Sequence, residues 1–313
     1  MTSADVARES GVSRATVSYV LNDTPDRSIS AATRALVLET AERLGHVPYA
    51  PARALRSGRM NVVLVIVPGF SIGYIFDLTL DDLNRTLGSR GYALLVTRIR
   101  EEKEGLNLRE LWGSVTPTLV VAMGGLPDHA RRFIAMSQAP LIDERGILSH
   151  VEMGRMQAEY LIGRGHTRLA FAYPEDPSID RYARQRLEGV TEVCLARGLE
   201  APVVGWIGTR VDAVRQVIEY WRRTGITAVC AHNDDLGLMI LTALRTMGLE
   251  PGEDLAVMGV DDIPLAAMGL TTIAISTEVF TAALIERVVA ALEQREPVPP
   301  TEPTLRLVVR SSA

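Results

Sequence analysis

The sequence predicts a small all-α head followed by a much larger α/β portion, built as two lobes around parallel sheets. Three observations predict this architecture. The first 46 residues contain short helical segments separated by glycine and polar residues. From residue 61 onward, apolar runs typical of buried strands alternate with helical segments, which is the pattern of parallel sheets covered by helices. The length of 313 residues also exceeds one ordinary core, so two or three compact units are expected.

The head is expected to contain three helices. Thr2 can cap the first helix, which Gly11 breaks, and Ser13 can cap a second helix over 14–21. Ser30 can cap a longer third helix, which Gly45 ends. The residues expected to form the core of the first two helices are Val6, Ala7, Val12, Val17 and Val20. The apolar positions expected to face inward from the third helix are Ala35, Leu38, Ala41 and Leu44.

Residues 48–60 contain Pro48 and Pro51 and are too short and too polar to form a core, so we interpret them as a hinge segment. The expected domains are therefore 1–47, 48–60 and 61–313. Buried strands are expected at 62–67, 92–97, 118–123, 168–173, 228–231 and 255–260. Helices are expected at 76–90, 153–164, 182–197, 211–224, 236–247 and 279–294. The expected lobes are an N-lobe of about 61–147 plus 277–300 and a C-lobe of about 148–276 plus 301–313.

Composition and charge favour a globular protein of the cytoplasm. No apolar run approaches the ~20 residues that span a bilayer, and the first residues lack the features of a signal peptide. Cys194 and Cys230 lie in apolar stretches, which predicts reduced, buried thiols with no disulfide or metal role. Residues 1–60 hold eight arginines and six acidic residues, whereas the whole chain has a formal net charge of -5, so the head is the more basic part.

A helix, a tight glycine turn and a second helix form a helix-turn-helix arrangement. The matching residues are 5–22 (DVARESGVSRATVSYVLN), 37–39 (VLE), 44–48 (LGHVP) and 52–59 (ARALRSGR). Together these residues closely resemble the DNA-binding head of the lactose/galactose-repressor (LacI/GalR-type) family. The resemblance implies a two-fold dimer that binds a pseudo-palindromic DNA operator.

The expected core leaves Arg14, Ala15 and Tyr19 on the outer face of the second helix. The resemblance implies that these positions reach base edges in the major groove, where an arginine can pair with guanine. Tyr19 stands where an arginine is frequent in the family. The alternative is that Arg14 and Tyr19 are solvated surface. The residues for which phosphate contact and helix capping both remain open are Thr2, Ser13, Thr16 and Ser30.

The resemblance also assigns a role to the hinge segment. In the family this segment folds into a helix on DNA and inserts a leucine into the minor groove, where an apolar wedge unstacks a base step. The matching residue is Leu55, flanked by Arg53 and Arg56 for phosphate contacts. The alternative is that Leu55 is an ordinary linker residue packing on its own head.

Residues 61–313 are similar to the periplasmic-binding-protein-like sensor of the same family. The residues that carry this similarity are 91–92 (GY), 161–171 (LIGRGHTRLAF), 186–189 (RLEG), 233–234 (ND), 257–264 (VMGVDDIP) and 270–272 (LTT). The resemblance implies that Arg186, Asn233 and Asp261 grip a small effector. A guanidinium, an amide and a carboxylate suit a polyhydroxylated or heteroatom-rich ligand.

Other residues are weaker ligand candidates. An aromatic residue such as Tyr74, Phe76 or Trp206 can stack on an apolar face of a ligand. Ser149 and His150 stand where aspartate and asparagine are usual in the family. Several alternatives stay open. Arg186 can form a surface salt bridge, and Asn233 and Asp261 can cap loops. The residues for which a structural role is favoured are Asp234, Asp262 and the turn histidine His166.

The resemblance implies a DNA-binding transcription regulator, a repressor like most of its family, whose operator affinity responds to a sugar-like or nucleoside effector between the lobes. We expect no catalytic residue, cofactor or metal. An enzyme using Asp234-Asp235 and Asp261-Asp262 as metal ligands is one competing class, but no P-loop, nucleophile elbow or histidine motif accompanies them. A transport solute-binding protein is another, opposed by the N-terminal head and the missing signal peptide.

Overall fold

The computed structural model describes residues 1–21, 29–46, 61–68, 73–99, 105–124, 126–143 and 147–313. The chain divides into two compact units, Met1–Met60 and Asn61–Ala313, which we call the head and the sensor. In the described part of the chain, no helix has the length and apolarity needed to cross a membrane. The hinge residues Arg53, Leu55 and Arg56 lie outside the described residues.

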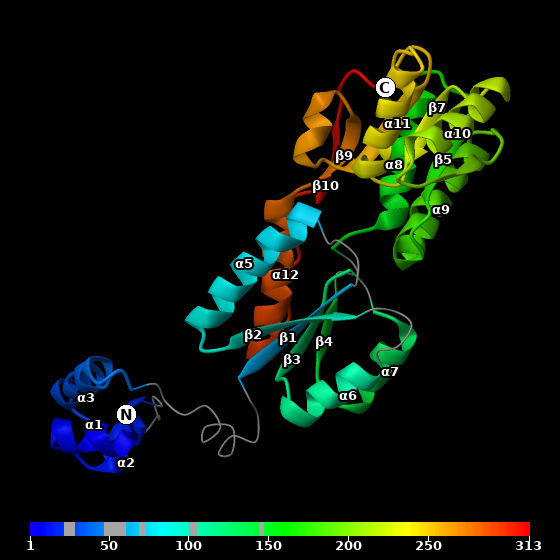
Figure 1. Ribbon diagram of the computed structural model, residues 1–313. Helices are drawn as coiled ribbons and strands as arrows, with labels where there is room; N and C mark the ends of the chain where they lie inside the picture. The colour runs from blue at the N-terminus through cyan, green and yellow to red at the C-terminus, as the bar shows by residue number, and fades with distance from the viewer. Residues whose placement is uncertain (22–28, 47–60, 69–72, 100–104, 125, 144–146) are drawn as a thin grey trace. The chain divides into compact units, whose positions relative to one another are not determined.

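In the described part of the head, three helices pack together, which are α1 (Ser3–Ser10), α2 (Arg14–Leu21) and α3 (Ala31–Arg43) (Figure 1). Its core confirms the prediction for the first two helices. The buried residues of these helices are Val6, Ala7, Val17 and Val20, with Val12 packed against them. Gly11 adopts a left-handed backbone with φ of 67°, which L side chains rarely adopt, and so produces the tight turn between α1 and α2.

The predicted inner face of α3 was partly wrong. Ala41 is buried as predicted, but Leu38 is 47% exposed and Ala35 is also exposed. Val37, which was not predicted, is buried against α1 and α2. Two overlapping patterns with helical spacing run through this helix. The packing of α1 and α2 selects the side of the helix where Val37 lies with Ala41, and it leaves Ala35 and Leu38 outside the core. The predicted contact of Leu44 with the core is present.

The first sheet of the sensor is four-stranded and parallel, in the order β2-β1-β3-β4. Its strands are β1 (Val62–Pro68), β2 (Ala93–Ile99), β3 (Leu119–Ala122) and β4 (Leu141–Asp143). Helices α5 (Gly73–Ser89) and α12 (Thr277–Glu293) pack on one face, and α6 (Gly105–Ser114) and α7 (Asp128–Met136) pack on the other (Figure 1). Alternate residues of β1 serve opposite faces, so the apolar run has no polar side. We call this layer the N-lobe.

The second sheet has six strands in the order β10-β9-β8-β7-β5-β6, and we call the layer around it the C-lobe. Its strands are β5 (Leu169–Pro174), β6 (Val203–Ile207), β7 (Ala228–Ala231), β8 (Ala256–Asp261), β9 (Thr271–Ile275) and β10 (Leu305–Val308). Helices α8 (His150–Gly163) and α9 (Asp180–Ala196) cover one face. Helices α10 (Val211–Arg223) and α11 (Asp234–Thr246) cover the other. The short 3-10 helices η1 (Pro177–Ile179) and η2 (Pro264–Met268) lie in connections.

The structure contains strands that the sequence pattern did not predict, namely β4, β6, β9 and β10. It also contains the unpredicted helices α6 and α7. Strand β10 is antiparallel to β9, so the second sheet is not wholly parallel as expected. Cys194 and Cys230 are free and fully buried in the C-lobe core, as predicted.

Candidate functional site

The outer face of α2 is set by the residues that the helix buries. Val17 and Val20 face the core. At about 100° per residue, Ala15 and Tyr19 lie on the opposite side of the helix and Arg14 lies at the edge of that outer face. Arg14 and Ala15 are exposed, and Tyr19 is half-buried. The three predicted residues therefore share one face. Ser18 lies at the centre of the same face, and sequence reasoning missed it although the helical spacing alone could have found it.

Of the hydroxyl residues proposed as caps or phosphate contacts, Thr2, Ser13 and Ser30 accept from helix amides as caps, and Thr16 bonds Ser13. Thr2 Oγ1 accepts from Asp5 N at 3.4 Å, and the Asp5 carboxylate accepts from Thr2 N at 2.8 Å, so the two residues form a capping box. Ser13 Oγ accepts from Thr16 N at 3.0 Å and bonds Thr16 Oγ1 at 2.9 Å. Ser30 Oγ accepts from the amide of Thr33 at 3.1 Å. These contacts satisfy helix N-termini, whose positive ends also attract phosphates.

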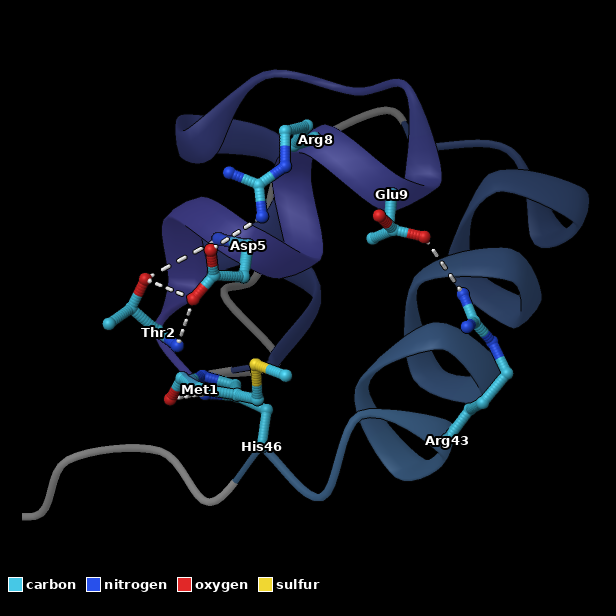
Figure 2. A network of polar contacts seen from close by, with 7 residues as sticks. All are labelled: Met1, Thr2, Asp5, Arg8, Glu9, Arg43 and His46. Atoms are coloured by element: carbon cyan, nitrogen blue, oxygen red, sulfur yellow. Dashed lines mark hydrogen bonds and ion pairs between the residues drawn. The ribbon is translucent and has the colours of Figure 1, made fainter.

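A network of polar contacts fixes the ends of the head (Figure 2). Arg43 on α3 pairs with Glu9 on α1 at 3.4 Å. The His46 ring bonds the Ser3 hydroxyl at 3.2 Å through Nε2 and the Met1 carbonyl at 3.2 Å through Nδ1. Asp5 also accepts from Arg8 at 2.8 Å, and the pKa of its carboxyl is lowered chiefly by the hydrogen bonds from Thr2. These contacts link the first and third helices at the surface of the head, while the buried core holds the helices together.

In the C-lobe, Arg186 is buried, with only 5% of its side chain exposed. Its Nη1 donates to the His232 carbonyl, and its Nη2 lies 3.3 Å from the Asp261 carboxylate. A surface salt bridge, the alternative interpretation of Arg186, is therefore wrong. Burial raises the pKa of the Asp261 carboxyl, while the neighbouring Arg186 charge opposes that shift. The structure thus brings together Arg186 and Asp261, two of the three residues predicted to bind an effector.

The chain makes a strained turn where β8 ends at Asp261. Asp261 and Asp262 have φ values of 109° and 52°, in the left-handed region that side chains other than glycine rarely adopt. Such backbone costs about 1–3 kcal/mol per residue and clusters at functional sites. Asp262 is held by Arg310, whose Nη2 donates to it at 2.7 Å. The turn therefore presents Asp261 toward Arg186 while Asp262 has the structural role that was favoured for it.

Asn233 and Asp234 open helix α11 and play local roles. Asn233 caps the helix, its Oδ1 accepting from the Leu236 amide at 3.1 Å. The buried Asp234 accepts from the Thr272 hydroxyl at 2.6 Å and from the Ile263 amide at 2.9 Å. Burial raises the pKa of Asp234 to about 7. Asp234 thus has the structural role that was favoured for it. In Asn233, the side-chain oxygen makes the capping contact.

Two glycines bring helices α8 and α9 into backbone contact. A Cβ on Gly154 would overlap the Arg186 carbonyl oxygen, and one on Gly189 would overlap the Val151 carbonyl oxygen. This close crossing sets the first turn of α8 beside Arg186. Ser149 caps α8 by accepting from the Glu152 amide at 3.2 Å. The next residue, His150, packs its ring on Tyr182 of α9 with 4.7 Å between centroids.

The aromatic ligand candidates differ in what surrounds them. Trp206 is 57% exposed on the edge strand β6 and rests its ring on Tyr173, with 4.6 Å between centroids. Tyr173 donates its hydroxyl to Asp180 at 2.7 Å. The backbone of Tyr74 lies in the first turn of α5 in the N-lobe. His166 bonds the Thr227 hydroxyl at 2.9 Å, which agrees with the favoured role of a turn histidine.

Sequence reasoning missed two buried polar residues beside Arg186. His232 follows β7, and Gln157 on α8 donates its amide to the carbonyls of Ala231 at 2.9 Å and Met258 at 3.0 Å. Gln157 therefore ties α8 to the carboxyl ends of β7 and β8. Neither residue could be predicted from the sequence, because a single polar residue inside an apolar segment forms no repeating pattern.

Two family models match the chain. Residues 2–49 match the bacterial regulatory proteins of the lacI family, and residues 158–313 match a periplasmic binding protein-like domain. The ribose operon repressor of Escherichia coli strain K12 is 30% identical over 294 residues, covering 87% of each chain.

Solved structures share the fold. A complex of the transcriptional regulator CelR with cellobiose is 25% identical with a TM-score of 0.67, and the alignment covers 100% of both chains. A lac repressor dimer bound to operator and the anti-inducer ONPF has a TM-score of 0.79 at 21% identity, covering 100% of this chain and 98% of that one. With a family model on the head and a 30% identical relative along most of its length, the chain belongs to the LacI family of bacterial regulatory proteins.

Proposed function

We propose that this chain is a sequence-specific transcription repressor whose affinity for operator DNA is controlled by a small ligand. The observation that carries the proposal is the rigid second helix of the head, whose inner face is fixed by Val17 and Val20 and whose outer face carries Arg14, Ala15 and Tyr19. A helix held in this way can enter the major groove with a defined register. Membership of the LacI family supports the same function.

In this proposal Arg14, Ala15 and Tyr19 contact base edges. A bidentate pair of arginine with guanine contributes about 1–3 kcal/mol of discrimination against the wrong base. Helices α1, α2 and α3 offer their amino-terminal ends to phosphates, and Thr2, Ser13, Thr16 and Ser30 act both as caps and as neighbours of the DNA backbone. In the hinge, Leu55 enters the minor groove between Arg53 and Arg56, which contact phosphates.

The effector is proposed to bind at the carboxyl edge of the C-lobe sheet, facing the N-lobe. Parallel-sheet proteins gather ligand-binding loops at that edge, and the buried Arg186 with Asp261 provides a donor and an acceptor there. The remaining residues proposed to line the ligand are Tyr74, Ser149, His150, Trp206 and Asn233. A similar protein is the repressor of a ribose operon, and a structural neighbour is a complex with cellobiose, and both support a sugar-like effector.

We propose that two chains bind a pseudo-palindromic operator together in the cytoplasm, where the bacterial chromosome lies. Domain limits of 1–47, 48–60 and 61–313 are proposed, with lobes of about 61–147 plus 277–300 and about 148–276 plus 301–313. Ligand binding changes the relation of the lobes and, through the dimer, the spacing of the two hinges. Coupling of this kind is typically about 1–3 kcal/mol.

The test begins by selecting operator DNA from random duplexes with the full chain. A chain lacking residues 1–60 is then compared with the full chain in gel-shift and calorimetric titrations. The proposal expects the shortened chain to lose operator binding and to keep small-ligand binding. If the shortened chain bound the selected duplex as tightly as the full chain did, the head would not be the DNA-binding element and the proposal would fail.

A substitution tests the proposed hinge contact. Leu55→Ala is expected to weaken operator binding, because the bent DNA loses the apolar wedge that holds its unstacked base step. Equal affinities of wild type and variant in the same gel-shift titration would contradict the wedge.

A further inference from the structure

Polar atoms that are buried and unpaired gather at one place in the C-lobe. In the described part of the chain, the residues that contribute such atoms there are His150, Gln157, Arg186 and His232, which we call the polar cluster. The atoms are both ring nitrogens of His150, Gln157 Oε1, Arg186 Nε and His232 Nδ1. Native proteins satisfy nearly all buried polar groups, so a concentration of unpaired ones at one site indicates a place where water or a bound molecule supplies the partners.

The cluster is assembled from separate elements and held in place by its other contacts. Gln157, Arg186 and His232 are each less than 5% exposed. Gln157 is fixed by the carbonyls of β7 and β8, and Arg186 by the His232 carbonyl and Asp261. The His150 ring rests on Tyr182. Since these side chains are already held in place, ligand binding does not carry the entropic cost of ordering them.

The charge state of the cluster distinguishes one class of ligand. Burial and the nearby Arg186 guanidinium lower the pKa of His150 to about 3 and hold the pKa of His232 well below its usual value. At neutral pH each ring is therefore uncharged and presents one donor and one acceptor. The charge of Arg186 is balanced by Asp261, 3.3 Å away. The negative charge of Asp235 contributes to the raised pKa of the Asp261 carboxyl.

Hydroxyl and amide groups both donate and accept, so they match neutral imidazoles and a side-chain amide oxygen. A phosphate dianion or a carboxylate offers acceptors only. Placed beside Arg186, it would compete with Asp261 and meet the charge of Asp235, and it would leave the acceptor atoms of the cluster without donors.

We infer that His150 and His232 contact the effector directly and restrict it to uncharged molecules rich in hydroxyl or amide groups. This inference rests on the proposed function, because it concerns the same ligand site. It adds His232 to the residues proposed to line that site and predicts that a phosphate placed against the polar cluster weakens binding.

The test measures binding to the full chain by isothermal titration calorimetry. The probes are D-ribose, D-glucose and adenosine, each beside its phosphate monoester. The variants are His150→Leu and His232→Leu, with His150→Asn as the conservative change because an amide keeps a donor and an acceptor. His166→Leu is the matched control, since His166 bonds Thr227 and has no place in the cluster. Calorimetric melting verifies that every variant folds.

At least one uncharged probe is expected to bind, and its phosphate ester to bind at least about tenfold more weakly. Each leucine variant should weaken the bound probe by at least about tenfold, with His150→Asn and His166→Leu within about threefold of wild type. Three results would overturn the inference: an ester that binds as well as its parent, a leucine variant with unchanged affinity, or no binding by any uncharged probe. Operator binding, measured in parallel by gel shift, separates these failures from failure of the proposed function.

Discussion

Two arginines carry much of the proposed recognition, and their surroundings differ. Arg14 is exposed on the outer face of α2, where water solvates the guanidinium until DNA replaces it. Arg186 is buried in the C-lobe and already bonded to a carbonyl and a carboxylate. Removal of Arg14 should therefore alter DNA selectivity and leave folding intact, whereas removal of Arg186 would leave Asp261 without its counter-charge and destabilise the sensor.

Arg14→Ala is expected to lower the preference for the selected operator by about 5-fold to 150-fold, equivalent to the about 1–3 kcal/mol of one base contact. Arg43→Ala is the matched control, because Arg43 pairs with Glu9 across the head and lies on α3. Competition gel shifts with operator and random duplex measure the preference. An Arg14→Ala chain with wild-type discrimination would remove Arg14 from the DNA-reading face.

The buried Asp234 makes a prediction about pH. Its pKa is raised from 3.8 to about 7, chiefly by burial. A raised folded-state pKa gives a contribution to stability that is full below about pH 4 and is lost as pH rises through about 7, by about 1.4 kcal/mol per unit at most. Asp234→Asn keeps a neutral group that can bond Thr272 and Ile263, so the thermal transition of the sensor should depend less on pH. Identical pH profiles of wild type and variant in calorimetry would contradict the assignment.

At the scale of elements, the crossing of α8 and α9 determines the geometry of the ligand site. These helices approach closely enough that Gly154 and Gly189 each lie against a backbone carbonyl of the other helix. Because α8 begins at His150 and α9 carries Arg186, any separation of the helices moves both residues.

Gly154→Ala is expected to destabilise the sensor by about 1–3 kcal/mol, because the added methyl forces the two helices apart. It should also weaken ligand binding. Gly163→Ala is the control, since the last position of α8 has open space around it. Calorimetry of both variants measures the effect, and equal transition temperatures would show that the crossing tolerates a methyl group.

Helices and strands were predictable where their own apolar pattern was unambiguous, and they were not where tertiary packing decides which residues are buried. Helix α2 was predictable because Val17 and Val20 alone define its inner face. Helix α3 was not, since Val37 and Leu38 both fit a helical pattern and only packing against α1 selects between them. Strand β9 begins with Thr271 and Thr272, whose hydroxyls are buried through bonds to Arg310 and Asp234, so no apolar run marked it.

The site was predictable where a side chain followed a strand, as Asp261 does. It was not predictable where distant segments meet. His232 and Gln157 acquire their roles only because α8 crosses the ends of β7 and β8. The strained backbone at Asp261 was not predicted either, because aspartate adopts a left-handed conformation more often than most residues but only in a minority of its occurrences.

At the scale of the whole molecule, one small head offers a single short helix to DNA, so tight binding is expected to need two heads on two half-sites. Replacing one half-site of the selected operator by random sequence should reduce affinity by at least about 100-fold, because each mismatched base pair costs about 1–3 kcal/mol. Fluorescence anisotropy at fixed protein and salt concentrations measures the change. An unchanged affinity would indicate that a single head suffices.

The ratio of affinities for the selected operator and for a shuffled duplex of equal length, measured at one salt concentration, tests sequence-specific reading by the head most directly. We predict an operator affinity at least about 10³-fold higher, the range of specific regulators. This ratio should fall sharply in the Arg14→Ala chain. A ratio close to one for the folded wild-type chain, with and without the small-molecule probes, would contradict sequence-specific regulation.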